Sequence, residues 1–254
     1  MEKITSVNND TVKRVCSLNE KKYRRYYGTF LVESFKLVNE VVCGALEYEK
    51  IYIEEGFEEK YSELISKVED KVIVLSKPAF EKISETITSQ GIIAEVKMRP
   101  TLQFVADESF LILDRISDPG NMGTIIRTAA AVGISKIVLL NCVDPYNPKT
   151  VRSSAGGIFY VDFYPLEMNE LFEQCKKYNA KIYIADMNGE NIFDLKNVDK
   201  VFGLVVGNEG SGVSDVLKTN ADRILSLPMK EQMESLNAGV SASVLMYQLK
   251  KDEL

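Results

Sequence analysis

The 254-residue chain contains no histidine. This absence excludes Ser-His-Asp and Cys-His nucleophilic mechanisms, and it excludes histidine as a general acid or base. The four cysteines are far apart and form no Cys-x-x-Cys pair, so the sequence predicts neither a zinc site nor a disulfide scaffold. Any proton transfer must therefore use carboxylates, lysine, tyrosine, arginine or the backbone.

Long hydrophobic runs are also lacking. No apolar run approaches the ~20 residues needed to cross a bilayer, and the first residues contain no apolar core of a signal peptide. The final Lys251–Leu254 spells an ER-retention signal, which cannot be read without a signal peptide. We therefore expect a cytoplasmic protein that has no membrane partner.

The net charge of −6 argues weakly against a nucleic-acid partner, but phosphate binding depends on local charge. One short segment holds six basic residues: Lys13, Arg14, Lys21, Lys22, Arg24 and Arg25. Tyr23, Tyr26 and Tyr27 accompany them, and Glu20 is the one acidic residue in that segment. Basic residues interleaved with aromatic residues suit RNA. A solvated amphipathic helix explains the segment equally well, so both interpretations stay open at this point.

The hydrophobic pattern divides the chain into two domains, 1–98 and 106–254. The first domain alternates short strands with helices, and one helix is predicted over residues 12–27. The second domain has continuous apolar runs separated by helical segments, which predicts an α/β fold with a parallel sheet covered on both faces. Its predicted strands span 110–114, 136–140, 181–185, 200–206 and 223–227. Functional groups should then lie in the loops at the carboxyl ends of these strands.

The first such loop, residues 114–127, follows a strand and opens a helix. Pro119 and Gly120 predict a turn, and Asn121 is a suitable helix cap. Arg127 lies less than two helical turns beyond Asn121. The loop lacks the spacing of a P-loop, and an ordinary strand-to-helix connection explains it as well.

The second loop, Gly207–Gly212, has three glycines around Glu209 and leaves backbone N–H groups free to face a ligand. Its spacing differs from the Rossmann pattern, which argues against an NAD-dependent oxidoreductase. The third loop, residues 227–239, holds Pro228 after a strand. Ser235 and Asn237 follow at the predicted start of the last helix, where plain capping would also explain them.

Together and in this order, the three loops resemble the SpoU/TrmH family of RNA ribose methyltransferases. The first motif of that family is matched by Asn121, Gly123 and Arg127. The second is matched by Gly207, Glu209, Gly210 and Gly212, and the third by Pro228, Met229, Ser235, Leu236 and Asn237. The first domain also resembles the substrate-binding domain that precedes many members, although Ser34 stands where many members have glycine.

The resemblance implies a deep trefoil knot that holds S-adenosylmethionine as cosubstrate, with no metal. The cofactor-binding residues implied are Ala185, Gly207, Glu209, Gly210, Leu227, Met229 and Leu236. The implied catalytic residues are Asn121, Arg127, Glu209, Ser235 and Asn237. Because the pKa of arginine exceeds ~12, we assign Arg127 to binding a phosphate and polarising the 2′-hydroxyl rather than to acting as a base.

The resemblance further implies a homodimer in which the partner subunit contributes the arginine. The predicted function is 2′-O-methylation of RNA, and the additional first domain favours 23S rRNA over tRNA. A non-catalytic RNA-binding protein on the same scaffold and a base-nitrogen methyltransferase are the alternatives. Intact Arg127, Glu209 and Asn237 argue against the first alternative, and the Ser-Leu-Asn motif argues against the second.

Overall fold

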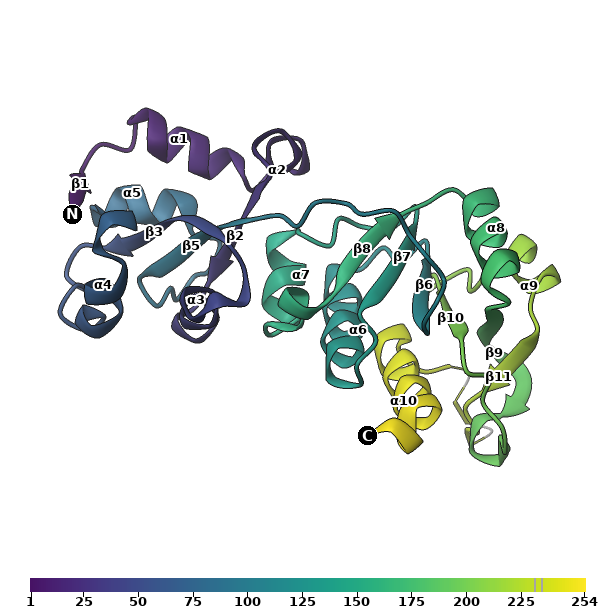
Figure 1. Cartoon of the computed structure of the whole chain (residues 1–254). Helices are drawn as coiled ribbons and strands as arrows, with labels where there is room; N and C mark the ends of the chain where they lie inside the picture. Colours follow the sequence, from purple (N-terminus) through teal and green to yellow (C-terminus); the bar gives the residue numbers. More distant parts are fainter. Residues whose placement is uncertain (231, 234) are drawn as a thin grey trace. The chain divides into compact units, whose positions relative to one another are not determined.

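The computed structural model describes residues 1–230, 232–233 and 235–254 (Figure 1). The chain forms two compact units. The first unit contains Met1–Arg99 and Tyr146–Arg152, and the second contains Pro100–Pro145 and Ser153–Leu254. Among the described residues, no helix combines the length and apolar character needed to span a membrane.

The first unit is built on a mixed five-stranded sheet in the order β1-β4-β3-β5-β2. Strands β1, β4 and β3 are parallel, and β5 runs antiparallel to both of its neighbours. The strands are β1 (Glu2–Ile4), β2 (Thr29–Glu33), β3 (Tyr48–Glu54), β4 (Val72–Leu75) and β5 (Ile92–Lys97). The helices are α1 (Asp10–Ser17), α2 (Lys21–Tyr27), α3 (Phe35–Glu40), α4 (Ser62–Val68), α5 (Lys77–Ile83) and α7 (Pro148–Ser153), whose last residue already lies in the second unit.

The helix predicted over residues 12–27 is wrong as one helix, because the structure has α1 and α2 in its place. The interruption falls at Leu18, whose side chain is buried and whose carbonyl oxygen accepts a hydrogen bond of 2.7 Å from the Arg24 guanidinium. Burial of an apolar side chain and a charge-assisted hydrogen bond compensate for the helical bonds lost there. Gly28, at φ 67°, ends α2 in the left-handed conformation that glycine tolerates best.

The second unit has a six-stranded parallel sheet in the order β11-β9-β10-β6-β7-β8, which confirms the predicted fold class. The strands are β6 (Phe110–Asp114), β7 (Lys136–Leu140), β8 (Asp162–Pro165), β9 (Lys181–Asn191), β10 (Phe202–Gly207) and β11 (Arg223–Ser226). The helices are α6 (Pro119–Ala131), α8 (Met168–Tyr178), α9 (Asp215–Thr219) and α10 (Ala238–Lys250). Every residue of β6 is buried, as expected for a parallel sheet with two covered faces.

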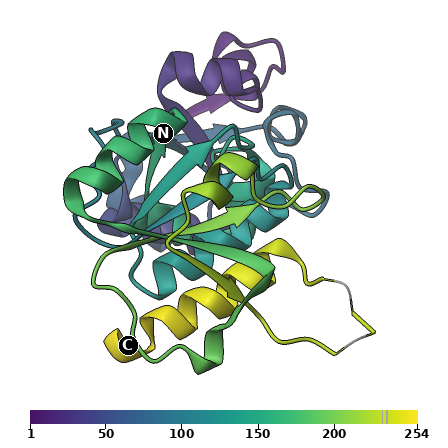
Figure 2. The same ribbon diagram turned by 90° about the vertical axis from the view of Figure 1, so that its right-hand side faces the viewer.

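Helices cover this sheet on both sides (Figure 2). Side chains of α8 and α9 join one core cluster with alternate residues of the strands, such as Phe110 and Ile112. Helices α6 and α10 pack against each other on the opposite side. The trefoil knot implied by the family resemblance stays a prediction.

Two helix starts in the second unit differ from the sequence-based expectation. Helix α6 begins at Pro119, and the Asp118 carboxylate caps it by accepting a 2.8 Å hydrogen bond from the Asn121 N–H. Asn121 is therefore not the cap, because a proline at the first helical position moves the start of the helix forward. Helix α10 begins at Ala238 and is capped by the Asn237 side chain, so Ser235 precedes it.

Candidate functional site

The three glycine- and asparagine-rich loops lie at one edge of the second unit's sheet. The loops follow β6, β10 and β11, which together with β9 form the neighbouring parallel strands β11-β9-β10-β6, so they emerge at the same end of the sheet. Ligands of open parallel sheets bind outside such carboxyl ends. The three loops therefore lie where the strand pattern of the sequence predicted them, at the carboxyl ends of the parallel strands.

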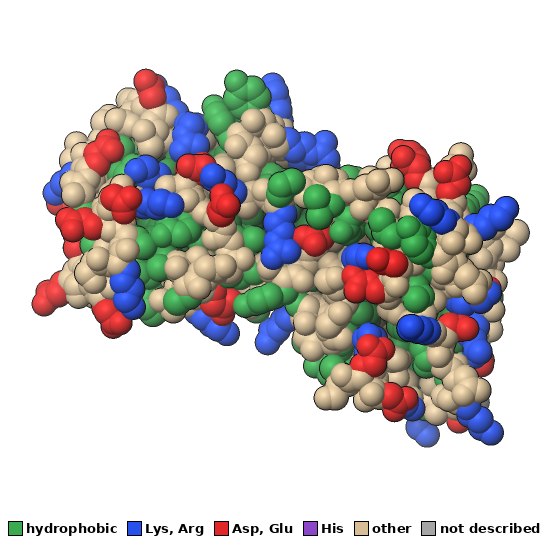
Figure 3. Space-filling view, in the orientation of Figure 1, with side chains coloured by type: hydrophobic (Ala, Val, Ile, Leu, Met, Phe, Trp, Pro, Cys, Tyr) green, Lys and Arg blue, Asp and Glu red, His purple; other side chains and the backbone are tan. Residues whose placement is uncertain are grey.

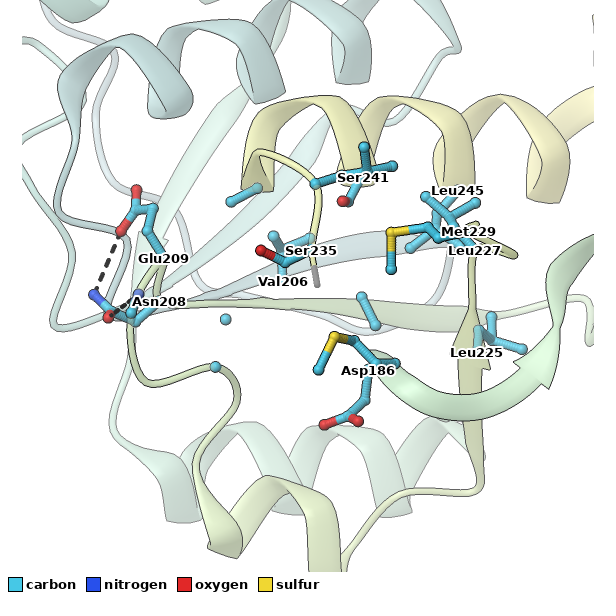
Figure 4. Close-up of a pocket in the computed structure, with 17 residues that line it drawn as sticks. Asp186, Val206, Asn208, Glu209, Leu225, Leu227, Met229, Ser235, Ser241 and Leu245 are labelled. Atoms are coloured by element: carbon cyan, nitrogen blue, oxygen red, sulfur yellow. Dashed lines mark hydrogen bonds between the residues drawn. The ribbon is translucent and has the colours of Figure 1, made fainter. Parts of the chain in front are cut away.

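A cavity of about 370 Å³ opens at this edge (Figure 4). All seven predicted cofactor-binding residues line it: Ala185, Gly207, Glu209, Gly210, Leu227, Met229 and Leu236. Aliphatic side chains such as Leu225 and Leu245 form much of the wall, and the hydroxyl-bearing Ser235 and Ser241 also line it (Figure 4). An apolar wall with a few polar groups is typical of small-molecule sites.

Several lining residues were missed by the sequence-based assignment. Asp186 and Met187 follow Ala185 on β9, whereas Ser241 and Leu245 lie on α10. The i, i+4 spacing of Ser241 and Leu245 places them on one face of the helix, which is the signal that could have found them. That signal is informative only once the face of α10 toward the sheet is known.

A chain of side-chain hydrogen bonds links the three loops. The Asn237 amide donates to Asn121 Oδ1 at 2.7 Å, and the Asn121 amide donates to Glu209 Oε1 at 2.9 Å. Asn121 is only 8% exposed. A buried amide that is satisfied on both sides has a fixed orientation. Three predicted catalytic residues from distant parts of the sequence are thus brought together.

Glu209 is held by neutral donors. Its carboxylate accepts hydrogen bonds from the Ser117 hydroxyl at 3.0 Å and from the Asp118 N–H at 3.3 Å, in addition to Asn121. Burial alone would raise the pKa of Glu209, but these hydrogen bonds together lower it below its usual value. Among the described residues, no lysine or arginine forms an ion pair with Glu209. Glu209 is therefore an anion at neutral pH that has no ion-pairing cation within the described part of its own chain.

The glycine loop that carries Glu209 is fixed by Arg115. The Arg115 guanidinium contacts both carboxylate oxygens of Asp114, at 3.0 and 3.2 Å, and donates to the Gly212 carbonyl at 3.1 Å. The Asn208 amide donates to the Arg115 carbonyl at 2.8 Å, and the Ser214 N–H donates to Asp114 at 2.7 Å. Both ends of the loop are thereby tied to the end of β6.

Gly207 is required by close packing within this loop. A Cβ atom at position 207 would lie 2.4 Å from the Gly212 carbonyl carbon and equally near the Val213 nitrogen. Real Cβ atoms do not make contacts this short, so a larger residue would displace the backbone that lines the cavity. This glycine therefore sets the shape of the loop.

Arg127 does not join the cluster around Glu209 within one chain. It is exposed on α6, and its side chain forms no hydrogen bond or ion pair with any residue that the structure describes. Arg127 lies six residues beyond Asn121, which corresponds to roughly 9 Å along the helix axis and about 120° around it. Arg127 therefore points away from the face on which Asn121 meets Glu209.

The six basic residues of the first unit have two different environments. Arg24 is only 2% exposed and binds the Leu18 carbonyl, and Arg14 forms two hydrogen bonds with the buried Glu95. The burial of Arg24 argues against an RNA contact at that residue, whereas the side chain of Arg14 is 32% exposed, and the RNA contacts of Arg14 and the other four residues stay predictions. The other four residues are exposed: Lys13, Lys21, Lys22 and Arg25.

The comparison with family models decides the identity of the second unit. Residues 108–247 match the model of the SpoU rRNA methylase family, and residues 9–94 match that of an MRM3-like substrate-binding domain. The chain belongs to the SpoU rRNA methylase family. This confirms the family predicted from the three motifs, and with it the enzyme class of RNA methyltransferase.

Individual members of the SpoU family resemble the whole chain. The 23S rRNA (guanosine(2553)-2′-O)-methyltransferase RlmP of Bacillus subtilis is 34% identical over 98% of this chain and 100% of its own length. An S-adenosylmethionine-bound rRNA methyltransferase from Sinorhizobium meliloti has the same fold, with a TM-score of 0.87, 23% identity and coverage of 100% and 98% of the two chains. A TrmH-family protein from Porphyromonas gingivalis has a TM-score of 0.82 at 25% identity, over 96% and 98% of the chains.

Metal-ligating side chains do not cluster in the part of the chain that the structure describes. It contains no group of three or more His, Cys, Asp or Glu side chains arranged to hold a metal ion. The carboxylates nearest the cavity, Asp186 and Glu209, have other partners: Lys218 at 2.8 Å for Asp186, and the amide, hydroxyl and backbone donors named above for Glu209.

Proposed function

We propose that this SpoU-family enzyme transfers a methyl group from S-adenosylmethionine to a ribose 2′-hydroxyl of 23S rRNA. The observation that carries the proposal is the hydrogen-bonded chain of Asn237, Asn121 and Glu209, which joins three loops around the cavity. The full-length similarity to RlmP, which acts on a 23S rRNA ribose, favours that substrate over tRNA.

The cavity suits the proposed cosubstrate. Its volume is within the range of ~300–1,000 Å³ found for small-molecule sites. The aliphatic side chains of Leu225, Leu227 and Leu245 can cover a flat base, while the backbone of the glycine loop approaches without side chains. When bound, S-adenosylmethionine supplies a methyl group activated by a sulfonium. The enzyme must then mainly align the 2′-oxygen and manage one proton.

Glu209 and Arg127 have different roles in this proposal. The lowered pKa of Glu209 makes it a weak proton acceptor, so its main role is to orient Asn121 and, through it, Asn237. Arg127 is available to bind the phosphate beside the target ribose and to polarise the 2′-hydroxyl. Ser235 lies on the wall of the cavity and can hydrogen-bond the reacting groups.

We further propose a homodimer in which each site uses Arg127 of the partner subunit. The support is that Glu209 has no ion-pairing cation among the described residues of its own chain, and that Arg127 points away from Glu209. A second copy of the chain would supply the missing charge to each site.

Subunit mixing tests this arrangement. Arg127→Ala and Glu209→Gln homodimers should each be nearly inactive. Mixed dimers should recover activity, because one of their two sites then combines an intact Arg127 with an intact Glu209. Mixtures that stay inactive after verified subunit exchange would show that both residues act in the same chain.

The substrate is tested with purified enzyme, tritiated S-adenosylmethionine and total RNA or ribosomal particles from cells that lack the gene. Label in a 2′-O-methyl nucleoside of 23S rRNA is the expected result. Label in tRNA or in a base-methylated nucleoside would overturn the proposed substrate. Calorimetric binding of S-adenosylmethionine without label in free RNA or in ribosomal particles would indicate a non-catalytic protein.

A further inference from the structure

Two neighbouring aromatic side chains at the end of α2 are exposed. Tyr26 is 78% exposed and Tyr27 is 40% exposed. Their ring centroids lie 4.9 Å apart at 85°, an edge-to-face arrangement. Large apolar groups that stay together on a surface generally mark a contact with another molecule. Neither tyrosine belongs to the core cluster that includes Val12, Val15 and Leu18.

Tyr27 is supported from within the unit. The Arg14 guanidinium lies 5.5 Å from the centroid of its ring. Arg14 is fixed in turn by two hydrogen bonds of 2.6 and 2.7 Å to Glu95, which is fully buried and also accepts hydrogen bonds from Tyr52 and Thr29. This network places a rigid cation behind the ring, so Tyr27 is held in position before any ligand binds.

The chain on both sides of the tyrosines is fixed as well. Gly28 ends α2 and its carbonyl accepts a 2.7 Å hydrogen bond from the Met98 N–H. Thr29 begins β2 and its hydroxyl donates to Glu95. Arg24, one turn before Gly28, binds the Leu18 carbonyl between the two helices. Arg14 and Arg24, which are both bound to groups within the unit, therefore build the surface that carries the tyrosines.

The tyrosines are surrounded by positive charge. Lys21, Lys22 and Arg25 are exposed on the same seven-residue helix, and α2 itself contains no acidic residue. Hydrophobic and basic side chains accordingly gather over α2 (Figure 3). Exposed rings beside exposed cations complement the two parts of an unpaired nucleotide, its base and its phosphate. An acidic protein surface would need the cations but would leave the planar rings unexplained.

We propose that Tyr26 and Tyr27 form a stacking surface for unpaired bases of the RNA substrate, with Lys21, Lys22 and Arg25 holding the adjoining phosphates. The inference rests on the proposed function in one respect, namely that RNA is the substrate. It adds a second, base-contacting site in the first unit, separate from the methyl-transfer cavity. Tyrosine is suited to this role because few rotatable bonds are immobilised when a base stacks on it.

The test uses the full-length protein and a short unpaired RNA that carries 2-aminopurine, whose fluorescence is quenched when the base stacks. Wild-type protein should quench the fluorescence on binding. Tyr26→Leu should weaken binding by about tenfold and reduce the quenching at saturation, whereas Tyr26→Phe should retain both. Tyr160→Leu, which removes an exposed tyrosine of the second unit, serves as the matched control and should leave both unchanged.

The charges are tested separately. Lys21→Gln and Lys22→Gln should lower the affinity and flatten its dependence on salt, while the quenching at saturation stays the same. Full quenching by Tyr26→Leu would overturn the proposal. The proposal would also be overturned if Tyr26→Leu weakened binding to ribosomal particles but not to free RNA, since the tyrosines would then contact protein.

The fluorescence assay does not depend on methyl transfer. Quenching by an enzyme that fails to methylate 23S rRNA would contradict the proposed function and leave the stacking surface standing. Methylation of 23S rRNA by an enzyme that shows no quenching would support the proposed function and contradict the stacking surface.

Discussion

Glu95 in the first unit and Glu209 in the second unit are both carboxylates that hydrogen bonds hold as anions, but their partners differ. Glu95 is fully buried and bound by the Arg14 guanidinium. Glu209 lies at the edge of a cavity and is bound by an amide, a hydroxyl and backbone N–H groups. In both cases burial would raise the pKa, and the hydrogen bonds lower it more.

The difference in binding partners separates a carboxylate with a structural role from one with a functional role. A buried anion next to a permanent cation is fully compensated, and it fixes the elements around it. An anion held only by neutral dipoles keeps its charge available to an incoming group. We therefore assign Glu95 to the architecture of the first unit and Glu209 to the reaction.

The largest effect is expected on stability, from removing the Arg14 guanidinium that binds Glu95. Arg14→Met leaves Glu95 buried without a counter-charge, which should lower the unfolding free energy of the first unit by about 3 kcal/mol. The measurement is urea unfolding followed by circular dichroism. Arg14→Met combined with Glu95→Met should restore most of the loss, because no unpaired charge remains. If the single variant is as stable as wild type, Glu95 does not depend on Arg14.

Removing the charge of the second carboxylate should affect catalysis instead. Glu209→Gln keeps the size of the side chain but weakens its hold on Asn121, and we expect kcat to fall about a hundredfold, equal to ~2.7 kcal/mol. Unfolding free energy should change little, because Glu209 is exposed. Ser117→Ala, which removes one of several donors, is the matched control and should reduce kcat much less. A large loss of stability in Glu209→Gln would contradict the comparison.

Arg115 should affect binding of the cosubstrate more than turnover. Arg115→Met breaks the contacts to Asp114 and Gly212 that fix the glycine loop. We expect S-adenosylmethionine to bind about tenfold more weakly, which is ~1.4 kcal/mol, with a nearly normal kcat at saturation. Arg115→Lys should recover part of the affinity through one remaining ion pair. Isothermal calorimetry and steady-state kinetics distinguish this outcome from an equal loss in kcat, which would assign Arg115 to the reaction itself.

The smallest expected effect is on how the stability of the first unit depends on pH. The pKa of Glu95 in the folded chain lies below its usual value of 4.5. Its contribution to stability is therefore complete above about pH 4.5 and is lost as the pH falls through the folded pKa. Acid unfolding of wild type should show this loss, and the Arg14→Met and Glu95→Met double variant should lack it. Identical acid profiles would mean that Glu95 is not the responsible group.

The sequence alone determined the fold class of the second unit and the loops that carry its site. Continuous apolar strands separated by helices require a parallel sheet, and Gly207–Gly212 and Asn237 stand directly after such strands or before a helix. Glycine and proline restrict the backbone locally, so turns are readable from the chain itself. The family followed from the order of the three motifs, because residue types and spacing are local properties as well.

Only the tertiary structure decided which polar groups meet. Nothing in the local sequence pairs Arg14 with Glu95, or Asn121 with Glu209 and Asn237, because these residues are brought together by strand order and helix packing. The same basic segment that reads as one helix became two helices, with two arginines turned inward and two tyrosines left outside. Burial and long-range hydrogen bonds depend on the whole fold, and they separated the structural charges from those free to act.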